Sequence, residues 1–176
     1  MKKLLLYFTL LFSGMSLVSC GYTTGSALPS NLKTIYVSEF KNNIDFSTES
    51  RRNLYFPLLE VDVRNQIIER FLFDGNLRVT DENQADLILR GELTGYDRGA
   101  LRYTDNDDVQ EYRVHIIVSL KMYDARTQEV MWTETSFVGE ATYFITGAQA
   151  TTEESALQEA VEDLARRIVE RTIEDW

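Results

Sequence analysis

The densest group of carboxylates in the sequence lies at residues 104–108, Thr-Asp-Asn-Asp-Asp. Calcium loops need oxygen ligands at alternating positions, a glycine for the turn and a distal bidentate glutamate. Val109 stands where a third ligand should lie, and no glycine follows it. We therefore expect a hairpin loop between two long strands in preference to a calcium site.

His115 is the only histidine of the chain, and the alternating residues around it predict a position in the middle of a strand. A catalytic histidine needs an orienting carboxylate and a nucleophile within hydrogen-bond reach. Glu111 and Ser119 share its expected strand face, but neighbours on one face of a strand are about 6.5 Å or more apart. We therefore expect a solvated or contact-face histidine without a catalytic role.

Other reactive groups are scarce. One cysteine excludes an internal disulfide and any multi-cysteine metal site, and one histidine excludes every two-histidine metal motif. The sequence also lacks a Walker loop, a dinucleotide fingerprint and a nucleophile elbow. These observations predict a protein that is not an enzyme and binds no cofactor, with a periplasmic hydrolase as a remote alternative.

Cys20, the only cysteine, ends a segment with the three-part layout of a bacterial export signal. Met1-Lys2-Lys3 is cationic, residues 4–11 are almost entirely apolar, and small residues follow. The apolar run is shorter than the roughly 20 residues that span a bilayer as a helix. We expect residues 1–19 to be a signal peptide that is cleaved before Cys20.

The tetrapeptide Leu-Val-Ser-Cys at 17–20 resembles the lipobox of bacterial lipoproteins. The resemblance implies that the Cys20 thiol carries a diacylglycerol and that the new amine is acylated, so several acyl chains would anchor the protein. The alternative is an ordinary secretory signal with an incidental cysteine. Gly21 stands where an aspartate would indicate inner-membrane retention by enterobacterial analogy, and this favours the outer membrane.

The chain that follows the signal is acidic. It contains 16 basic and 28 acidic residues, a net charge of −12. Such a surface repels phosphate backbones, and neither a basic stripe nor a stacking aromatic motif offsets this repulsion. We therefore do not expect the protein to bind nucleic acid. Arginine outnumbers lysine 13 to 3 in this part of the chain. Arginine suits bidentate contact with phosphate or carboxylate groups.

We expect a lipidated tether at residues 20–32 and one folded domain at residues 33–176. The tether is rich in Gly, Ser and Thr and lacks periodicity, as flexible linkers do. The domain begins with an expected strand at 34–40, with Ile35 and Val37 on one side and Tyr36 and Phe40 on the other. Residues 41–55 are polar and predict a long loop.

Two amphipathic helices are expected. The first follows Pro57 and ends at Gly75, and its apolar stripe is Leu59, Val63, Ile67 and Phe71, widened by Ile68 and Leu72. The second begins with a capping box of Thr151 and Glu154, and its stripe is Leu157, Val161, Leu164 and Ile168.

Further strands are expected between the helices, at 77–79, 87–96, 110–123 and 130–138. The stretch 110–123 alternates most clearly, with even positions apolar and odd positions mainly polar. The order strand, helix, strands, helix predicts an α+β fold. We expect a two-layer sandwich, in which two helices cover one face of a four-stranded, mainly antiparallel sheet.

The uncovered face of this sheet is the candidate contact surface. We expect polar side chains of two neighbouring strands to lie side by side there. One strand contributes Arg90, Glu92, Thr94, Tyr96 and Arg98, and the next contributes Arg113, His115, Ser119, Lys121 and Tyr123. We single out four cations there as candidate contacts, Arg90, Arg98, Arg113 and Lys121. A solvated sheet face without a ligand is an equally good interpretation.

Several segments resemble the lipopolysaccharide-assembly lipoprotein family LptE, and they follow one another in the order found in that family. They are residues 20–22, 32–42, 71–79, 85–91, 111–113 and 129–132. The resemblance implies an outer-membrane lipoprotein on the periplasmic side that plugs the β-barrel translocon LptD, assists its assembly and contacts lipopolysaccharide. The four candidate cations would meet its phosphates.

A second family remains possible. Lipoproteins that activate peptidoglycan synthases, and related TolB-like domains, also begin with a strand that ends Phe-x-Asn, as Phe40-Lys41-Asn42 does here. That resemblance implies an enzyme regulator. The Asp74-Gly75 helix end and the Ala85-Asp86 strand entry resemble LptE more closely.

Overall fold

The computed structural model describes residues 28–45 and 56–174. The expected signal peptide, Cys20 and most of the tether lie outside the described residues. The elements in chain order are β1 (Thr34–Val37), β2 (Lys41–Asn42), α2 (Leu59–Asp74), β3 (Arg78–Val79), η2 (Glu82–Gln84), β4 (Leu87–Tyr103), β5 (Val109–Asp124), β6 (Val130–Phe144) and α3 (Glu153–Glu174). Among the described residues, no helix combines the length and apolar content needed to cross a bilayer.

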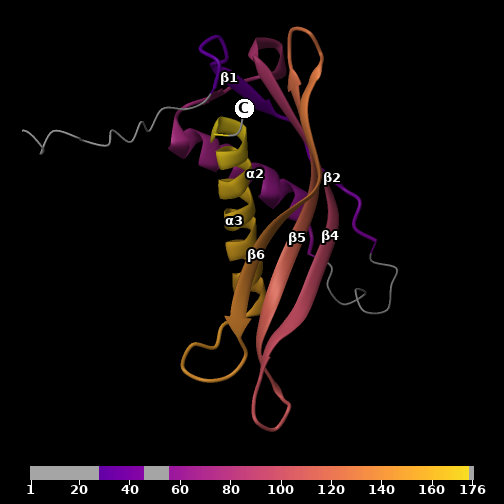
Figure 1. Ribbon diagram of the computed structural model, residues 1–176, viewed down its shortest axis with the longest axis vertical. Coiled ribbons are helices and arrows are strands. Elements are labelled where there is room, and N and C mark those ends of the chain that lie inside the picture. The colour runs from indigo at the N-terminus through magenta and orange to yellow at the C-terminus, as the bar shows by residue number, and fades with distance from the viewer. Residues whose placement is uncertain (1–27, 46–55, 175–176) are drawn as a thin grey trace, which may run out of the picture.

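The strands form one open, mixed sheet (Figure 1). Its order is β3-β1-β4-β5-β6, and the short β2 also pairs with β4. The long strands β4, β5 and β6 are antiparallel, whereas β1 pairs in parallel with β3 and β4. The predicted α+β sandwich with a mainly antiparallel sheet is confirmed. The sheet has six strands and not the four that we expected: the short strand at 77–79 is present as β3, and β2 forms within the segment 41–55 that we expected to be a loop.

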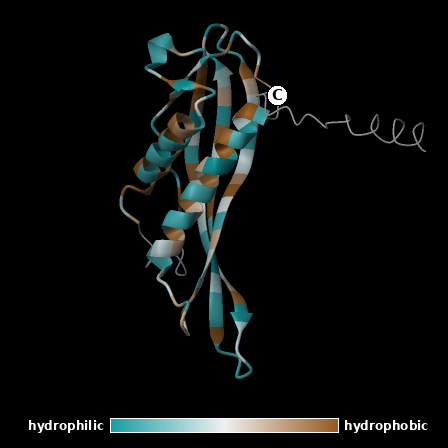
Figure 2. Cartoon of the chain, turned by 90° about the vertical axis from the view of Figure 1, so that its left-hand side faces the viewer, coloured by the Kyte–Doolittle hydropathy of each residue, from teal (hydrophilic) through white to brown (hydrophobic). Residues whose placement is uncertain are grey.

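Both helices pack on one face of the sheet, the inner face, and enclose the core (Figures 1 and 2). The alternation of β5 determines this face: its even-numbered side chains are fully buried, namely Val114, Ile116, Val118, Leu120 and Met122. Their odd-numbered neighbours point to the other, uncovered face, the outer face. Leu32, the last residue of the expected tether, is also buried in the core.

Helix α2 follows the predicted stripe. Leu59, Val63, Ile67 and Phe71 are buried, and Gly75 ends the helix with a φ of 78° while its N–H donates to Phe71 O. The expectation that Leu72 belongs to the buried stripe is wrong, because its side chain is 63% exposed. One residue beyond Phe71, it points about 100° around the helix, away from the sheet.

The N-cap residue of helix α3 lies one position later than predicted. Thr152, not Thr151, accepts the backbone N–H of Ser155 at 3.1 Å, which leaves Glu153 in the first turn. The helix then approaches β6 closely at Gly139. A Cβ atom there would lie 2.4 Å from both Ala160 O and Leu164 Cβ, so only glycine permits this contact.

Phe40 lies beyond β1, and our expectation that it faces away from Ile35 and Val37 is wrong. Its ring is buried on the inner face against Gly91, where a Cβ atom would lie 2.1 Å from the ring. The chain leaves the strand at Ser38, so the simple alternation does not reach Phe40.

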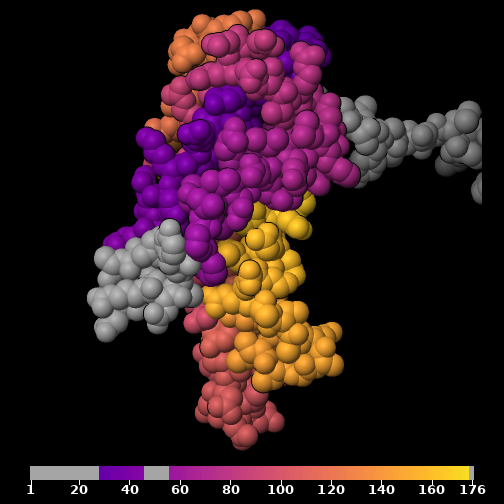
Figure 3. Space-filling model, turned by 180° about the vertical axis from the view of Figure 1, so that it is seen from behind, coloured from indigo at the N-terminus to yellow at the C-terminus, as the bar shows by residue number. Residues whose placement is uncertain are grey.

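The carboxylate cluster at 104–108 forms the β4–β5 hairpin loop, as predicted. Thr104 N donates to Asp108 O at 2.8 Å, and Asp107 takes a positive φ of 64°. The hairpin projects beyond the helices (Figure 3). Within the described residues, no group of three His, Cys, Asp or Glu side chains is arranged to hold a metal ion.

Candidate functional site

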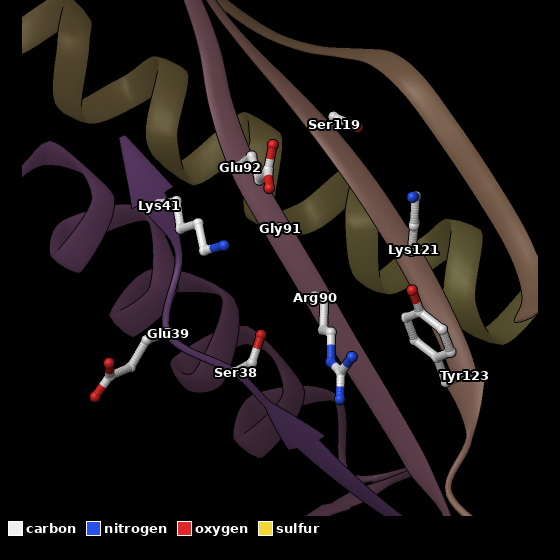
Figure 4. Close-up of a pocket in the computed structure, with 9 residues that line it drawn as sticks. All are labelled: Ser38, Glu39, Lys41, Arg90, Gly91, Glu92, Ser119, Lys121 and Tyr123. Carbon is white, nitrogen blue, oxygen red and sulfur yellow. The ribbon is translucent and has the colours of Figure 1, made fainter. Parts of the chain in front are cut away.

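A shallow pocket on the outer face is lined by cationic side chains from three strands (Figure 4). Its volume is about 210 Å³. Lys41 comes from β2, Arg90 from β4 and Lys121 from β5, and Tyr123 lies beside them. The remaining lining residues are Ser38, Glu39, Gly91, Glu92 and Ser119. We call this set the Arg90 pocket.

Arg90 and Lys121 are directly opposed in the register of β4 and β5. Like charges at opposed positions destabilise a sheet. Arg90 approaches Glu82 at 3.8 Å, but both side chains are about half exposed and this pair contributes little. Among the described residues, no carboxylate forms an ion pair with Lys121. The two cations therefore leave a local positive charge that an anion would neutralise.

The Arg90 guanidinium is held in place by an aromatic ring. It lies over Tyr123 at 4.9 Å from the ring centroid, a cation–π contact. An oriented guanidinium presents its planar donors to a phosphate or carboxylate with little loss of side-chain freedom. Arg90 and Lys121 are thus found where the sequence analysis expected them, on the outer face.

Acidic residues lie next to these cations. Glu92 pairs in register with Lys41 and accepts Asn43 Nδ2 at 3.1 Å, and Glu39 lines the same pocket. Carboxylates accept hydrogen bonds from hydroxyl groups but repel phosphates. The Arg90 pocket therefore suits a ligand that carries both anionic groups and hydroxyls.

Arg98 does not lie on the outer face, and this part of the prediction is wrong. The register of β4 and β5 shifts between Leu93 and Gly95, where a β-bulge inserts one residue. A one-residue insertion reverses the alternation, so Tyr96 and Arg98 turn to the inner face. Tyr96 is only 1% exposed.

Arg98 instead belongs to a network at the start of α3. Tyr96 Oη donates to Glu153 Oε1 at 2.7 Å, and Arg98 donates to Glu153 Oε2. The Arg98 guanidinium also lies 5.0 Å over the Tyr112 ring. Burial, followed by the hydrogen bond to Glu153, raises the pKa of Tyr96 above its ordinary value. This network fixes the first turn of α3 to the sheet.

Arg113 and His115 lie on the outer face, as predicted, but within a row of charges that spans three strands. His115 is paired in register with Asp97 and with Glu140. Its Nε2 lies 3.3 Å from Glu140 Oε2, and its Nδ1 lies 3.8 Å from Asp97 Oδ2. Arg113 lies 3.8 Å from Glu140. Arg113 therefore lies beside a carboxylate that it shares with His115, outside the Arg90 pocket.

Two features of the site escaped the sequence analysis. Lys41 was assigned to a loop, and only the parallel pairing of β2 with β4 brings it to the Arg90 pocket. Asp97 and Glu140 reach His115 from neighbouring strands, whereas we considered only carboxylates on its own strand. Both contacts join residues that are far apart in the chain, so no local sequence pattern predicts them.

Solved structures share the fold at low identity. Protein XCC0632 from Xanthomonas campestris has a TM-score of 0.54 at 12% identity, over 83% of this chain and 86% of that one. The hypothetical protein CT253 from Chlamydia trachomatis has a TM-score of 0.52 at 12% identity, over 80% and 95%. A minor lipoprotein from Acinetobacter baumannii has a TM-score of 0.50 at 14% identity, over 80% and 92%. These likenesses establish the fold alone.

The sequence comparison is more specific. No curated protein sequence matches the chain. The model of the LptE family, described as lipopolysaccharide assembly, matches residues 32–172. This range begins at the buried Leu32 and ends within α3, so among the described elements it includes every strand, all of α2 and all but the last two residues of α3. The chain therefore belongs to the LptE lipopolysaccharide-assembly family, whose members are non-enzymatic lipoproteins.

Proposed function

We propose that this protein is an outer-membrane lipoprotein, anchored through Cys20 on the periplasmic side, that plugs and helps to assemble an LptD-type β-barrel translocon. It takes part in lipopolysaccharide transport to the cell surface. The observation that carries this proposal is the match of the LptE family over residues 32–172.

The two faces of the sheet suit a plug. The helices bury the inner face, which supplies a rigid core, while the outer face exposes charged and polar side chains. A water-filled barrel lumen is lined by polar residues, so a plug needs a surface of this kind.

The Arg90 pocket supports direct contact with lipopolysaccharide. That molecule carries phosphates and sugar hydroxyls, which match the cations Lys41, Arg90 and Lys121 and the neighbouring Glu39 and Glu92. Of the four cations singled out from the sequence, Arg90 and Lys121 remain candidates for this contact. Arg98 is bound to Glu153 on the inner face, and Arg113 lies outside the pocket, beside Glu140.

The test of the partner is co-purification of the natively lipidated protein with a C-terminal tag in mild detergent. We expect stoichiometric recovery of a large outer-membrane β-barrel, identified by mass spectrometry, and none with a tagged unrelated lipoprotein. Recovery of a peptidoglycan synthase without a barrel would favour the TolB-like regulator instead.

The test of the ligand is charge reversal in the Arg90 pocket. Arg90→Glu with Lys121→Glu should weaken binding of purified lipopolysaccharide at least tenfold, because two phosphate contacts become repulsive. The matched control, Arg78→Glu with Arg126→Glu, makes the same change in net charge outside the pocket. Equal binding by both double variants would remove the Arg90 pocket from the proposal and leave the barrel partner untouched.

A further inference from the structure

Strand β6 is one edge of the sheet, and its two halves differ in how far other parts of the protein cover their outward backbone groups. Its C-terminal half runs beside α3, while its N-terminal half continues to the β5–β6 turn at the top of the view (Figure 1). An edge strand exposes a row of backbone N–H and C=O groups that can pair with another chain.

The C-terminal half of this edge is covered by groups of the protein itself. Glu140 N donates to Asp163 Oδ2 at 3.1 Å, and Val138 O accepts the Arg167 guanidinium. At the end of the strand, Phe144 O accepts Thr151 N at 2.9 Å. These contacts occupy outward backbone groups at positions 138, 140 and 144.

The N-terminal half lacks such cover. Even-numbered residues of β5 direct their backbone groups towards β6, as the bonds from Ile145 N to Gln110 O and from Asp124 N to Glu129 O indicate. Trp132 and Glu134, the register partners of Met122 and Leu120, therefore direct their backbone N–H and C=O groups towards β5. Thr133, which lies between them, therefore directs its N–H and C=O groups outward, and within the described residues nothing bonds to them. The register shifts at Met131, so the alternation is interrupted there.

Edge strands are commonly guarded by lysine, proline, β-bulges or inward-pointing charge. The N-terminal half of β6 has neither lysine nor proline, and its protection is limited to the inward-pointing Glu134 and to the register shifts that flank the pairs of Trp132 and Glu134. Val130–Thr135 reads Val-Met-Trp-Thr-Glu-Thr, and its one charge, Glu134, forms an ion pair with Arg171 at 3.1 Å. Val130 is 51% exposed and Met131 is 37% exposed. This is a strand with high β-propensity and an open edge.

We propose that Val130–Thr135 pairs through its backbone with an extended segment of the β-barrel partner, which adds a strand to the sheet beyond β6. This inference rests on the proposed function. A closed barrel wall has no free edge, so the added segment comes from a part of the partner outside its barrel ladder. A second copy of this chain is disfavoured, because two mature chains of net charge −12 repel each other.

Thr133→Pro tests the pairing. Proline removes the outward N–H and leaves the bonds of β5 to Trp132 and Glu134 in place, and edge strands accept it. In the co-purification experiment we expect barrel recovery to fall at least fivefold. Thr133→Ala keeps the N–H and should recover the barrel at the wild-type level, because recognition runs through the backbone.

Thr142→Pro is the matched control. It also removes an outward N–H, but it lies between the covered positions Glu140 and Phe144, so recovery should not change. Circular dichroism melting of the three variants identifies any loss of fold. As a second measurement, a photo-reactive residue at position 133 should cross-link to the barrel protein, and one at position 142 should not.

The outcomes separate the two proposals. Full recovery with Thr133→Pro, or equal cross-linking from positions 133 and 142, overturns the strand addition while the plug function stands. Cross-linking of position 133 only to a second copy of this chain also overturns it. Failure of the wild-type chain to recover any barrel defeats the proposed function itself.

Discussion

The inner and outer faces of the sheet are built from the same strands but hold their charges in opposite ways. On the inner face, Arg98 is engaged by Glu153 and stacks on Tyr112, and the charge serves to attach α3. On the outer face, Arg90 and Lys121 oppose each other without a carboxylate between them. A cation that has a partner within the fold stabilises structure, whereas a cation opposed to another cation is available to a ligand.

The largest expected effect breaks the inner face. Leu120→Ala removes a fully buried side chain and should lower the free energy of unfolding by about 2–5 kcal/mol. Ile117→Ala, on the partly exposed outer face of the same strand, should cost less than half as much. Urea unfolding of the mature chain measures both. Equal losses would mean that the outer face is packed in solution.

A second prediction tests the contact of α3 with β6. Gly139→Ala places a methyl group against the backbone of Ala160 and should cost about 1–3 kcal/mol. Gly99→Ala, in the same sheet, meets no atom within 4 Å and should change stability by less than about 0.5 kcal/mol. Thermal melting of the two variants makes the comparison. A tolerated alanine at position 139 would contradict the close packing of α3.

The third prediction concerns the Tyr96–Glu153 hydrogen bond. Tyr96→Phe should cost about 1 kcal/mol at neutral pH. The folded state raises the pKa of Tyr96, so the unfolded state loses this proton first as the pH rises above about 10. Stability therefore falls with rising pH, and the advantage of the wild type over Tyr96→Phe should shrink there. Unfolding at pH 8 and pH 11 measures it; a constant difference would exclude the linkage.

The smallest expected effect lies on the outer face and has the opposite sign. Lys121→Glu replaces an opposed pair of cations by an opposite-charge pair with Arg90, which should stabilise the fold by about 0.2–1 kcal/mol. Added salt should reduce this gain through screening. Lys121→Gln should give a smaller gain. A destabilised Lys121→Glu variant would show that Lys121 has a structural role.

Periodicity predicted most of the fold correctly. The stripe of α2, the end of that helix at Gly75 and the alternation of β5 follow directly from residue spacing, because each depends on a local period of 3.6 or 2 residues. The α+β class followed from the order of these elements. The family resemblance, carried by short segments along the chain, was likewise present in the sequence.

The tertiary structure decided which candidate cations are available. A single bulge near Thr94 turned Arg98 from the outer to the inner face, and parallel pairing of β2 brought Lys41 to the Arg90 pocket. The same holds for the edge of β6, half of which is covered by α3 and half of which is open. Sequence periods determine which side of an element is apolar. Bulges, register and packing between distant segments determine which polar groups meet, because those contacts depend on how strands align rather than on their own residues.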